Sequence, residues 1–230
     1  MSAYVYQVNS KKNNRFALIK SFSVNFWLIS LNILFFIIFF TLMNLNILSI
    51  DAIAIKPANI LAGKYLWTFL TSMFMHGGIW HLFFNMLSMI FIGGLVEKLL
   101  GRKRYFWFYI ISGLVASLVF VLTAYGLFLA GYPGDYNAMA VGASGALFAL
   151  VGFLMIITPN LPVLVFFVIP SKMKYAGPGL LIMLWLISVL GNIPIGNTAH
   201  FGGLIAGLVY GFYIKKKYKR KSMIISKYFS

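Results

Sequence analysis

The stretch AVGASGALFALVGFLMII, residues Ala140–Ile157, joins a long apolar run to a start rich in glycine, alanine and serine. A polar side chain inside a helix in lipid is costly, because it loses its hydrogen bonds to water. Ser144 therefore has two interpretations. It is a small residue that lets two helices approach closely, or it is a nucleophile held below the membrane surface. The rest of the chain has to distinguish them.

The composition is that of a protein embedded in a membrane. Hydrophobic residues make up 61% of the 230-residue chain, whereas a soluble domain contains about 45–50%. Runs of apolar residues predict membrane-spanning helices. We therefore expect an all-α membrane protein with six transmembrane helices. The six runs are Phe26–Leu48, His81–Leu100, Tyr105–Ala130, Ser144–Thr158, Gly179–Leu190 and His200–Ile214.

The distribution of charge predicts how the chain is oriented. The sequence has 19 Lys and Arg residues, three acids and a net charge of +16. In a soluble protein this balance would suggest nucleic acid, but in a membrane protein basic residues collect in cytosolic loops. With both termini in the cytosol, every basic residue except Lys56 and Lys64 falls on the cytosolic side. We expect the lipid bilayer, and not nucleic acid, as the partner of this charge.

The chain divides where the apolar runs begin and end. We expect a basic cytosolic N-terminal segment at residues 1–22, a six-span domain at 23–214 and a basic cytosolic tail at 215–230. The aromatic-rich loop after the first run is expected to lie in the outer membrane interface. In residues 159–178, the apolar run Val163–Ile169 is too short to span the membrane. We expect this segment to be an interfacial connector on the cytosolic side.

Four polar residues inside the runs share one depth. Ser144 and His200 each lie about 21 Å from the cytosolic end of their run, at ~1.5 Å per residue. His81 and Asn85 lie roughly 24 and 18 Å from the end of theirs, and their spacing of four places them on one helical face. Any one of these residues alone is readily explained by helix packing or a structural hydrogen bond. Four independent packing residues would not be expected to agree in depth.

Serine, histidine and asparagine at one depth are suited to nucleophilic catalysis. A serine needs a base to accept its proton, and His200 and His81 are the bases at this level. No carboxylate is available behind either histidine, since Glu97 lies at the cytosolic end, so the chemistry would be that of a Ser–His dyad. The remaining side chains and the Ser144 amide could stabilise an oxyanion. We expect no cofactor and no metal, because the chain has no cysteine and no acid lies near the histidines.

Four motifs, taken together with their order along the chain, resemble those of the rhomboid intramembrane serine proteases, over roughly residues 64–213. GASG resembles the family's G-x-S-G nucleophile motif, and AHFGGLIAG its A-H-x-x-G-x-x-x-G motif. HGGIWHLFFN resembles the H-x-x-x-x-H-x-x-x-N signature of the second span, and EKLLG an E-x-x-x-G element at the end of that span. The chain departs from the family pattern at Thr68, where Arg is common after Trp67, and at Phe148, where Tyr is common.

The resemblance implies a role for each residue of these motifs. Ser144 would be the nucleophile and His200 the general base, while His81 and Asn85 would form the oxyanion hole with the Ser144 amide. The supporting residues would be Gly142 and Gly145 around the nucleophile, His76 beneath the first loop, Phe148 stacked on the histidine, Gly203 and Gly207 in the helix contact, and Glu97.

The resemblance also implies what the protein acts on and where. Substrates would be single-span membrane proteins, cut near the outer membrane face. The fifth span and the loop Gly191–Ala199 would form the gate and lid. We expect a multi-pass protein of the bacterial plasma membrane, and the sequence does not specify its oligomeric state. The alternatives are a catalytically inactive rhomboid-like protein that binds membrane proteins, and a small transporter or channel.

Overall fold

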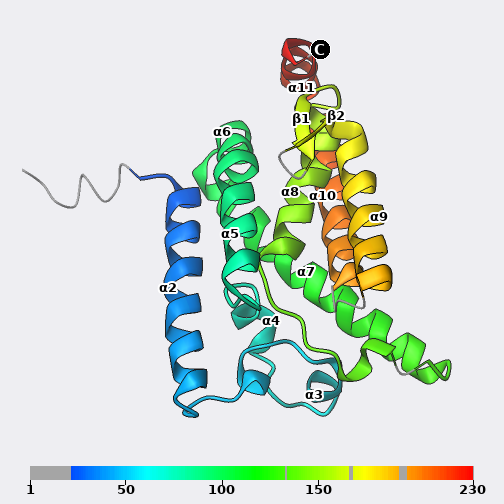
Figure 1. The fold of residues 1–230 in the computed structure, drawn as a ribbon. Coiled ribbons are helices and arrows are strands. Elements are labelled where there is room, and N and C mark those ends of the chain that lie inside the picture. Colours follow the sequence, from blue (N-terminus) through cyan, green and yellow to red (C-terminus); the bar gives the residue numbers. More distant parts are fainter. Residues whose placement is uncertain (1–21, 133, 166–167, 192–195, 230) are drawn as a thin grey trace, which may run out of the picture.

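The computed structural model describes residues 22–132, 134–165, 168–191 and 196–229. Almost all of the expected basic segment 1–22 lies outside these residues. The described chain forms a bundle of long helices (Figure 1). The helices of the bundle are α2 (Val24–Asn44), α5 (Ile79–Ser88), α6 (Gly94–Leu100), α7 (Arg102–Leu129), α8 (Ser144–Ile157), α9 (Met173–Gly191) and α10 (Asn197–Lys217), followed by α11 (Lys219–Tyr228).

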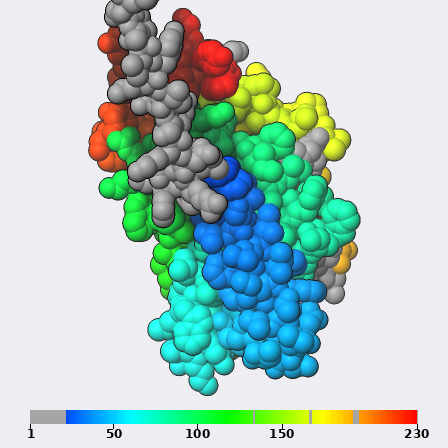
Figure 2. Space-filling model, turned by 90° about the vertical axis from the view of Figure 1, so that its left-hand side faces the viewer, coloured from blue at the N-terminus to red at the C-terminus, as the bar shows by residue number. Residues whose placement is uncertain are grey.

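Short helical turns fill the connections. The loop after α2 contains η1 (Ile50–Ala52), α3 (Pro57–Leu61) and α4 (Thr68–Thr71), and η3 (Gly134–Asn137) follows α7. A π-helical turn, η2 (Met89–Gly93), joins α5 to α6. Figure 2 shows α2 spread over one face of the molecule, with the loop residues gathered beneath its far end.

The two ends of the bundle differ in charge. The start of α2, the end of α6 and α11 lie at one end, and the loop that follows α2 lies at the other (Figure 1). We call the first the basic end, because it carries Lys98, residues 102–104 and residues 215–221. We call the second the loop end. Most of the basic residues in the described part of the chain therefore lie together at one end of the bundle.

Four helices among the described residues are long and apolar enough to cross a membrane. They are Val24–Asn44, Ile79–Leu100, Arg102–Leu129 and Met173–Gly191. Helix α8 is apolar but has only 14 residues, so it is about 21 Å long, less than the ~30 Å hydrocarbon core. It lies at the centre of the bundle, in contact with α5, α7, α9 and α10. The chain is therefore a helical, multi-pass membrane protein whose central helix is short.

The connector before α9 contains two short strands, which the sequence analysis did not predict. Strands β1 (Pro162–Val165) and β2 (Ile169–Lys172) pair antiparallel, with Val163 opposite Ser171. Valine favours extended backbone, and the apolar run is too short for a spanning helix. The fifth helix also begins earlier than expected, at Met173, and contains Pro178 in its interior.

Glycines bring the backbones of α8 and α10 into direct contact. A Cβ atom on Gly203 would overlap the carbonyl oxygen of Gly145, and one on Gly207 would overlap the carbonyl oxygen of Ala149. Any larger side chain at these positions would push the helices apart. The sequence analysis predicted such a small-residue stripe, and the structure places it between the helices that carry Ser144 and His200.

Glu97 connects the second membrane helix to the first. Its two carboxyl oxygens accept hydrogen bonds from the backbone N–H groups of Val24 and Asn25, each at 2.8 Å. These N–H groups belong to the first turn of α2, where they have no acceptor within the helix. Glu97 is buried, and Arg102 Nε lies 4.0 Å from its Oε1 atom. A side chain from α6 therefore caps the start of α2.

Asn25 fixes the π-helical turn at the same junction. Its Nδ2 atom donates to the carbonyl oxygen of Met89 at 2.8 Å, and its Oδ1 atom accepts from the Tyr105 hydroxyl at 2.6 Å. Gly93 leaves room for this contact, because a Cβ there would meet both Asn25 Oδ1 and the Tyr105 hydroxyl. The sequence analysis did not single out Asn25, although it is a polar residue at the edge of the first apolar run.

We predict that Gly207→Ala destabilises the bundle by about 1–3 kcal/mol, because the new methyl group overpacks the contact with Ala149. Thermal unfolding in detergent measures this as a lower Tm. Gly126→Ala is the matched control, since a Cβ at that position of α7 has nothing within 4 Å. An unchanged Tm in Gly207→Ala would show that the two helices do not pack as described.

We predict that Glu97→Gln destabilises the protein by about 1.5–3 kcal/mol, the typical contribution of a hydrogen bond to a charged group. A carboxamide has one acceptor oxygen, so one N–H of the α2 cap loses its partner. Thermal unfolding measures the loss, with the exposed neighbour Lys98→Gln as the control. Equal stability of the two variants would argue against the cap.

Candidate active site

Ser144 and His200 meet at the centre of the bundle. Ser144 is the first residue of α8, and His200 lies in the first turn of α10. The Nε2 atom of His200 is 2.8 Å from the Oγ atom of Ser144, and His200 is buried. For Nε2 to accept the serine proton, the neutral imidazole must carry its own proton on Nδ1. Nδ1 has no hydrogen-bond partner among the described residues.

The chain before Ser144 is held by the first loop. Ala140 and Ile55 form an isolated antiparallel bridge, and the N–H of Gly142 donates to the carbonyl oxygen of Ser72 at 2.8 Å. Gly142 has a φ of +122°, in the region that favours glycine. These contacts deliver an extended segment into the bundle and turn it sharply into α8. The first N–H groups of α8 have no acceptor within the helix.

The ring of Phe148 lies flat on the imidazole of His200. The two ring centroids are 4.6 Å apart, with an angle of 20° between the planes. Phe148 is one helical turn after Ser144, so the same helix supplies the serine and the surface that orients its histidine. The resemblance predicted this stacking, and the absence of a tyrosine hydroxyl does not prevent it.

His81 approaches Ser144 across Gly142. A Cβ atom on Gly142 would lie 2.8 Å from His81 Cε1, 2.9 Å from His81 Nε2 and 3.7 Å from Ser144 Oγ. Only a residue without a side chain fits between this imidazole and the serine. Gly142 is thus required to be glycine for two reasons, its backbone conformation and the space occupied by His81.

The backbone N–H of Gly77 determines which nitrogen of His81 carries the proton. It donates to His81 Nδ1 at 3.3 Å. Nδ1 is then the acceptor, so in the neutral ring the proton resides on Nε2. Nε2 lies 2.9 Å from the position that a Cβ atom on Gly142 would occupy, so the protonated nitrogen is on the side of the ring that faces Gly142. The sequence analysis quoted Gly77 within a motif but gave it no role, because the pattern of side chains does not reveal a backbone donor.

Asn85 and His76 surround this imidazole. Asn85 lies one turn after His81, is buried, and donates from Nδ2 to the His81 carbonyl oxygen at 2.8 Å, which leaves its second N–H. The ring of His76 packs edge-on against the rings of His81 and Phe36, with centroid distances of 5.1 Å and 6.4 Å, respectively. Burial, with a smaller effect from His81, lowers the pKa of His76 to about 3. His76 is therefore a neutral, packed side chain at neutral pH.

The structure separates the predicted residues into three groups. Ser144, His200, Phe148, Gly142 and His81 converge on one point, with Asn85 and His76 around His81. The glycines Gly145, Gly203 and Gly207 lie in the helix contact beside it. Glu97 lies away from both, at the basic end. Across the described ranges of the chain, no three His, Cys, Asp or Glu side chains are grouped so that they could hold a metal.

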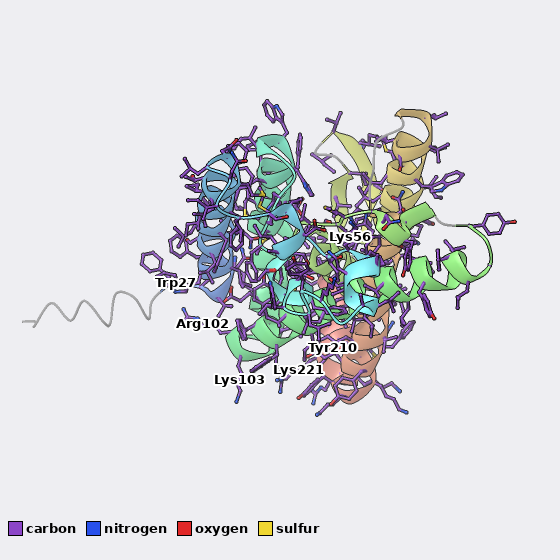
Figure 3. All side chains as sticks on the ribbon, turned by 90° about the horizontal axis from the view of Figure 1, so that it is seen from below. Trp27, Lys56, Arg102, Lys103, Tyr210 and Lys221 are labelled. Carbon is purple, nitrogen blue, oxygen red and sulfur yellow. The ribbon has the colours of Figure 1, made fainter. Side chains whose placement is uncertain are left out.

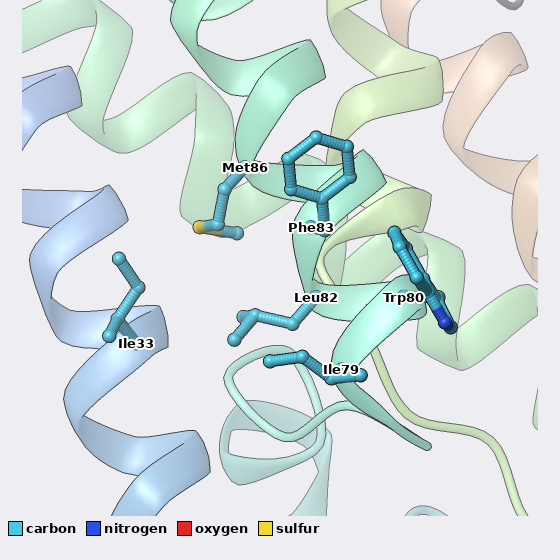
Figure 4. Close-up of a pocket in the computed structure, with 6 residues that line it drawn as sticks. All are labelled: Ile33, Ile79, Trp80, Leu82, Phe83 and Met86. Atoms are coloured by element: carbon cyan, nitrogen blue, oxygen red, sulfur yellow. The ribbon is translucent and has the colours of Figure 1, made fainter.

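Two apolar grooves are found between helices in the described part of the chain. One, of about 310 Å³, lies between α2 and α5 and is lined by Ile33, Ile79, Trp80, Leu82, Phe83 and Met86 (Figure 4). By helical spacing most of these α5 residues face away from His81 and Asn85. The other, of about 240 Å³, lies between α9 and α10 and is lined by Leu181, Ile182, Trp185, Asn197 and Phe201. Asn197 and Phe201 belong to the start of α10, the part of that helix that also contains His200.

Residues 63–217 match the rhomboid domain. RHOMBOID-like protein 5 of Arabidopsis thaliana is 34% identical over 152 residues, covering 64% of this chain and 43% of that protein. Rhomboid protein 1, mitochondrial, of Saccharomyces cerevisiae is 31% identical over 162 residues, covering 65% and 42%. Rhomboid protease GluP of Bacillus subtilis is 30% identical over 167 residues, covering 70% and 29%.

These relatives set the limits of the comparison. The chain spans less than half the length of each of them. They come from a plant, a yeast and a bacterium, so the similarity does not favour the bacterial membrane that the sequence analysis expected. The matched domain extends from the first loop to the end of α10 and includes every residue of the candidate site. The chain belongs to the rhomboid family.

Proposed function

We propose that the protein is an intramembrane serine endopeptidase. The observation that carries the proposal is the 2.8 Å contact between His200 Nε2 and Ser144 Oγ at the buried start of two adjacent helices. The name of the bacterial relative, a rhomboid protease, supports the same activity. The protease domain is residues 23–214, and it crosses the membrane six times with both termini in the cytosol. This orientation places the basic end in the cytosol, as the positive-inside rule requires.

The dyad divides peptide hydrolysis into two steps. Ser144 Oγ attacks the carbonyl carbon of the scissile bond while its proton passes to Nε2 of His200. The imidazolium then gives this proton to the leaving amine, and the acyl group stays on Ser144. Water attacks the ester, with His200 as the base, and restores the free serine. The stacked Phe148 keeps the imidazole aligned through both steps.

The oxyanion of each tetrahedral intermediate receives hydrogen bonds from three directions. His81 donates from Nε2, Asn85 from its remaining amide N–H, and Ser144 from its backbone at the positive end of α8. No rearrangement of His81 is needed, because Gly77 already holds the proton on the nitrogen that faces Gly142. Gly142 and Gly145 leave space for the substrate backbone to approach.

Single-span membrane proteins are the proposed substrates. They would be cut near the outer face, at the depth of Ser144, after part of the substrate helix has unwound. The apolar groove between α9 and α10, which reaches the start of α10, is the proposed path of approach. Helix α9 is the proposed gate. The proposed lid includes residues 192–195, which lie outside the described residues.

We predict that a fluorophosphonate probe labels the wild-type protein in detergent, and that Ser144→Ala and His200→Ala are labelled at least about 10³-fold more slowly. The alanine variants lose the nucleophile and its base, respectively. In-gel fluorescence measures the labelling, and thermal unfolding shows that each variant is folded. Lys64→Gln, in the first loop, is the control that should be labelled normally.

The same experiment separates the protease from its alternative. A folded wild-type protein that neither reacts with the probe nor cleaves a transmembrane reporter would favour an inactive rhomboid-like binding protein. If the Ser144→Ala variant were labelled as fast as the wild-type protein, Ser144 could not be the nucleophile.

We predict that Gly77→Pro slows fluorophosphonate labelling by at least about tenfold, whereas Gly77→Ala changes it little. Proline removes the N–H that fixes the His81 tautomer, and losing one oxyanion donor typically costs about 10²–10³ in rate. Alanine keeps the N–H, and its Cβ would meet His81 Nδ1 at an ordinary 3.8 Å. Equal labelling rates in the two folded variants would show that this hydrogen bond does not position His81.

A further inference from the structure

Two cations converge on one aromatic ring at the basic end of the bundle. Arg104, in the first turn of α7, donates from Nη2 to the hydroxyl of Tyr218 at 2.8 Å, and its guanidinium lies 5.2 Å from the ring centroid. Lys217 Nζ lies 5.9 Å from the same centroid and donates to the Tyr213 hydroxyl at 2.8 Å. Tyr218 is the residue at which the chain leaves α10 and enters α11.

No acid is available to neutralise these cations. The chain has three acidic residues, and none follows Asp135. Asp51 lies 3.6 Å from Lys56 in the first loop, and the oxygens of Glu97 accept the backbone N–H groups of α2. The basic residues of the last part of the chain are Lys215, Lys216, Lys217, Lys219, Arg220, Lys221 and Lys227. Their mutual repulsion favours the binding of an external anion.

Helix α11 lies across the basic end of the bundle (Figure 1). One side packs on the protein, with Ser222 buried and Ile225 partly buried. The other side exposes Met223 and Ile224, which are 55% and 62% accessible, and Tyr228. Arg220 and Lys227 lie on that same side by helical spacing. A face that mixes basic and apolar residues is typical of a helix in the membrane interface.

Helix α7 adds its own basic residues to this surface. Its first turn contains Arg102, Lys103 and Arg104, and the contact between Arg104 and Tyr218 joins the start of α7 to the start of α11. Figure 3, a view along the bundle, shows Lys103 and Lys221 projecting from the same edge of the molecule. The basic surface is therefore assembled from two segments that are far apart in the sequence.

We propose that this surface binds anionic phospholipid of the leaflet that adjoins the basic end. A headgroup phosphate would lie between Arg104 and Lys217, within reach of the basic residues of α11. Met223 and Ile224 would enter the region beneath the headgroups. Membrane orientation alone needs only basic residues; it requires neither a folded α11 nor the Arg104–Tyr218 contact that fixes the bend. Nucleic acid fits less well, because its binding would leave the exposed methionine and isoleucine in water.

The absence of cysteine from the chain makes a direct test possible. In the full-length protein, Ile224→Cys is labelled with an environment-sensitive nitrobenzoxadiazole fluorophore. The labelled protein is placed in nanodiscs of phosphatidylcholine alone or of an equimolar mixture with phosphatidylglycerol. We expect blue-shifted emission and quenching by brominated acyl chains in the anionic discs only. Emission typical of water in both discs, or equal insertion in both, would overturn the proposal.

Charge variants test the phosphate site itself. In the double variant Arg104→Gln, Lys217→Gln, the apparent affinity of α11 for anionic discs should fall about fivefold for each cation removed. This affinity is measured by following insertion of the label as the phosphatidylglycerol content is increased. Lys64→Gln, at the loop end, should have no effect. Thermal unfolding shows that the double variant is folded. Insertion equal to that of the parent would overturn the assignment of these residues.

A further arm distinguishes lipid from nucleic acid. If single-stranded DNA displaces the label from anionic discs and binds the detergent-purified protein with the same loss in the double variant, the surface belongs to nucleic acid and the proposal fails. If DNA neither displaces the label nor depends on these two residues, the lipid assignment holds. No readout depends on peptide cleavage, so this test and that of the protease are independent.

Discussion

The contact between the backbones of α8 and α10 is the constraint on which the site depends. Gly203 lies against the carbonyl of Gly145 and Gly207 against that of Ala149, so the helix axes are closer than side chains would allow. This approach brings a serine and a histidine, one at the start of each helix, within 2.8 Å. Phe148 and the glycine turn at Gly142 then refine the orientation of groups that the contact between α8 and α10 has already brought together.

More distant parts of the chain contribute the rest of the site around this helix contact. The first loop holds the segment before Ser144 through Ile55 and the carbonyl of Ser72. Helix α5 contributes His81, whose protonation is set by a backbone N–H rather than by another side chain. With no carboxylate near His200, the positions of neutral groups and helix termini are what remain to stabilise charge. Such a site requires accurate packing more than it requires strong ion pairs.

The sequence identified the residues that meet at the candidate site better than it identified the structure around them. Ser144, His200, His81 and Asn85 could be found because polar residues in apolar runs are rare and these shared a depth. The β-hairpin of β1 and β2 was missed, because a seven-residue apolar run is too short to show whether its periodicity is that of a helix or of a strand. Contacts made by the backbone of Gly77 or by the polar edge residue Asn25 depend on tertiary arrangement, which periodicity along one helix does not contain.

The π-helical turn between α5 and α6 sets the angular phase between the two ends of the second span. Asn25 donates a hydrogen bond to the first carbonyl oxygen of this turn, that of Met89, and this contact stabilises the extra residue in the turn. A π-helical turn takes up one residue more than an α-helical turn, so converting Met89–Gly93 to regular α-helix with all its residues kept would rotate one end against the other by about 100°, given 3.6 residues per turn. His81 and Asn85 could then not face Ser144 while Glu97 still capped α2. The π-helical conformation of this turn is therefore as strict a requirement as the identity of the histidine in the span.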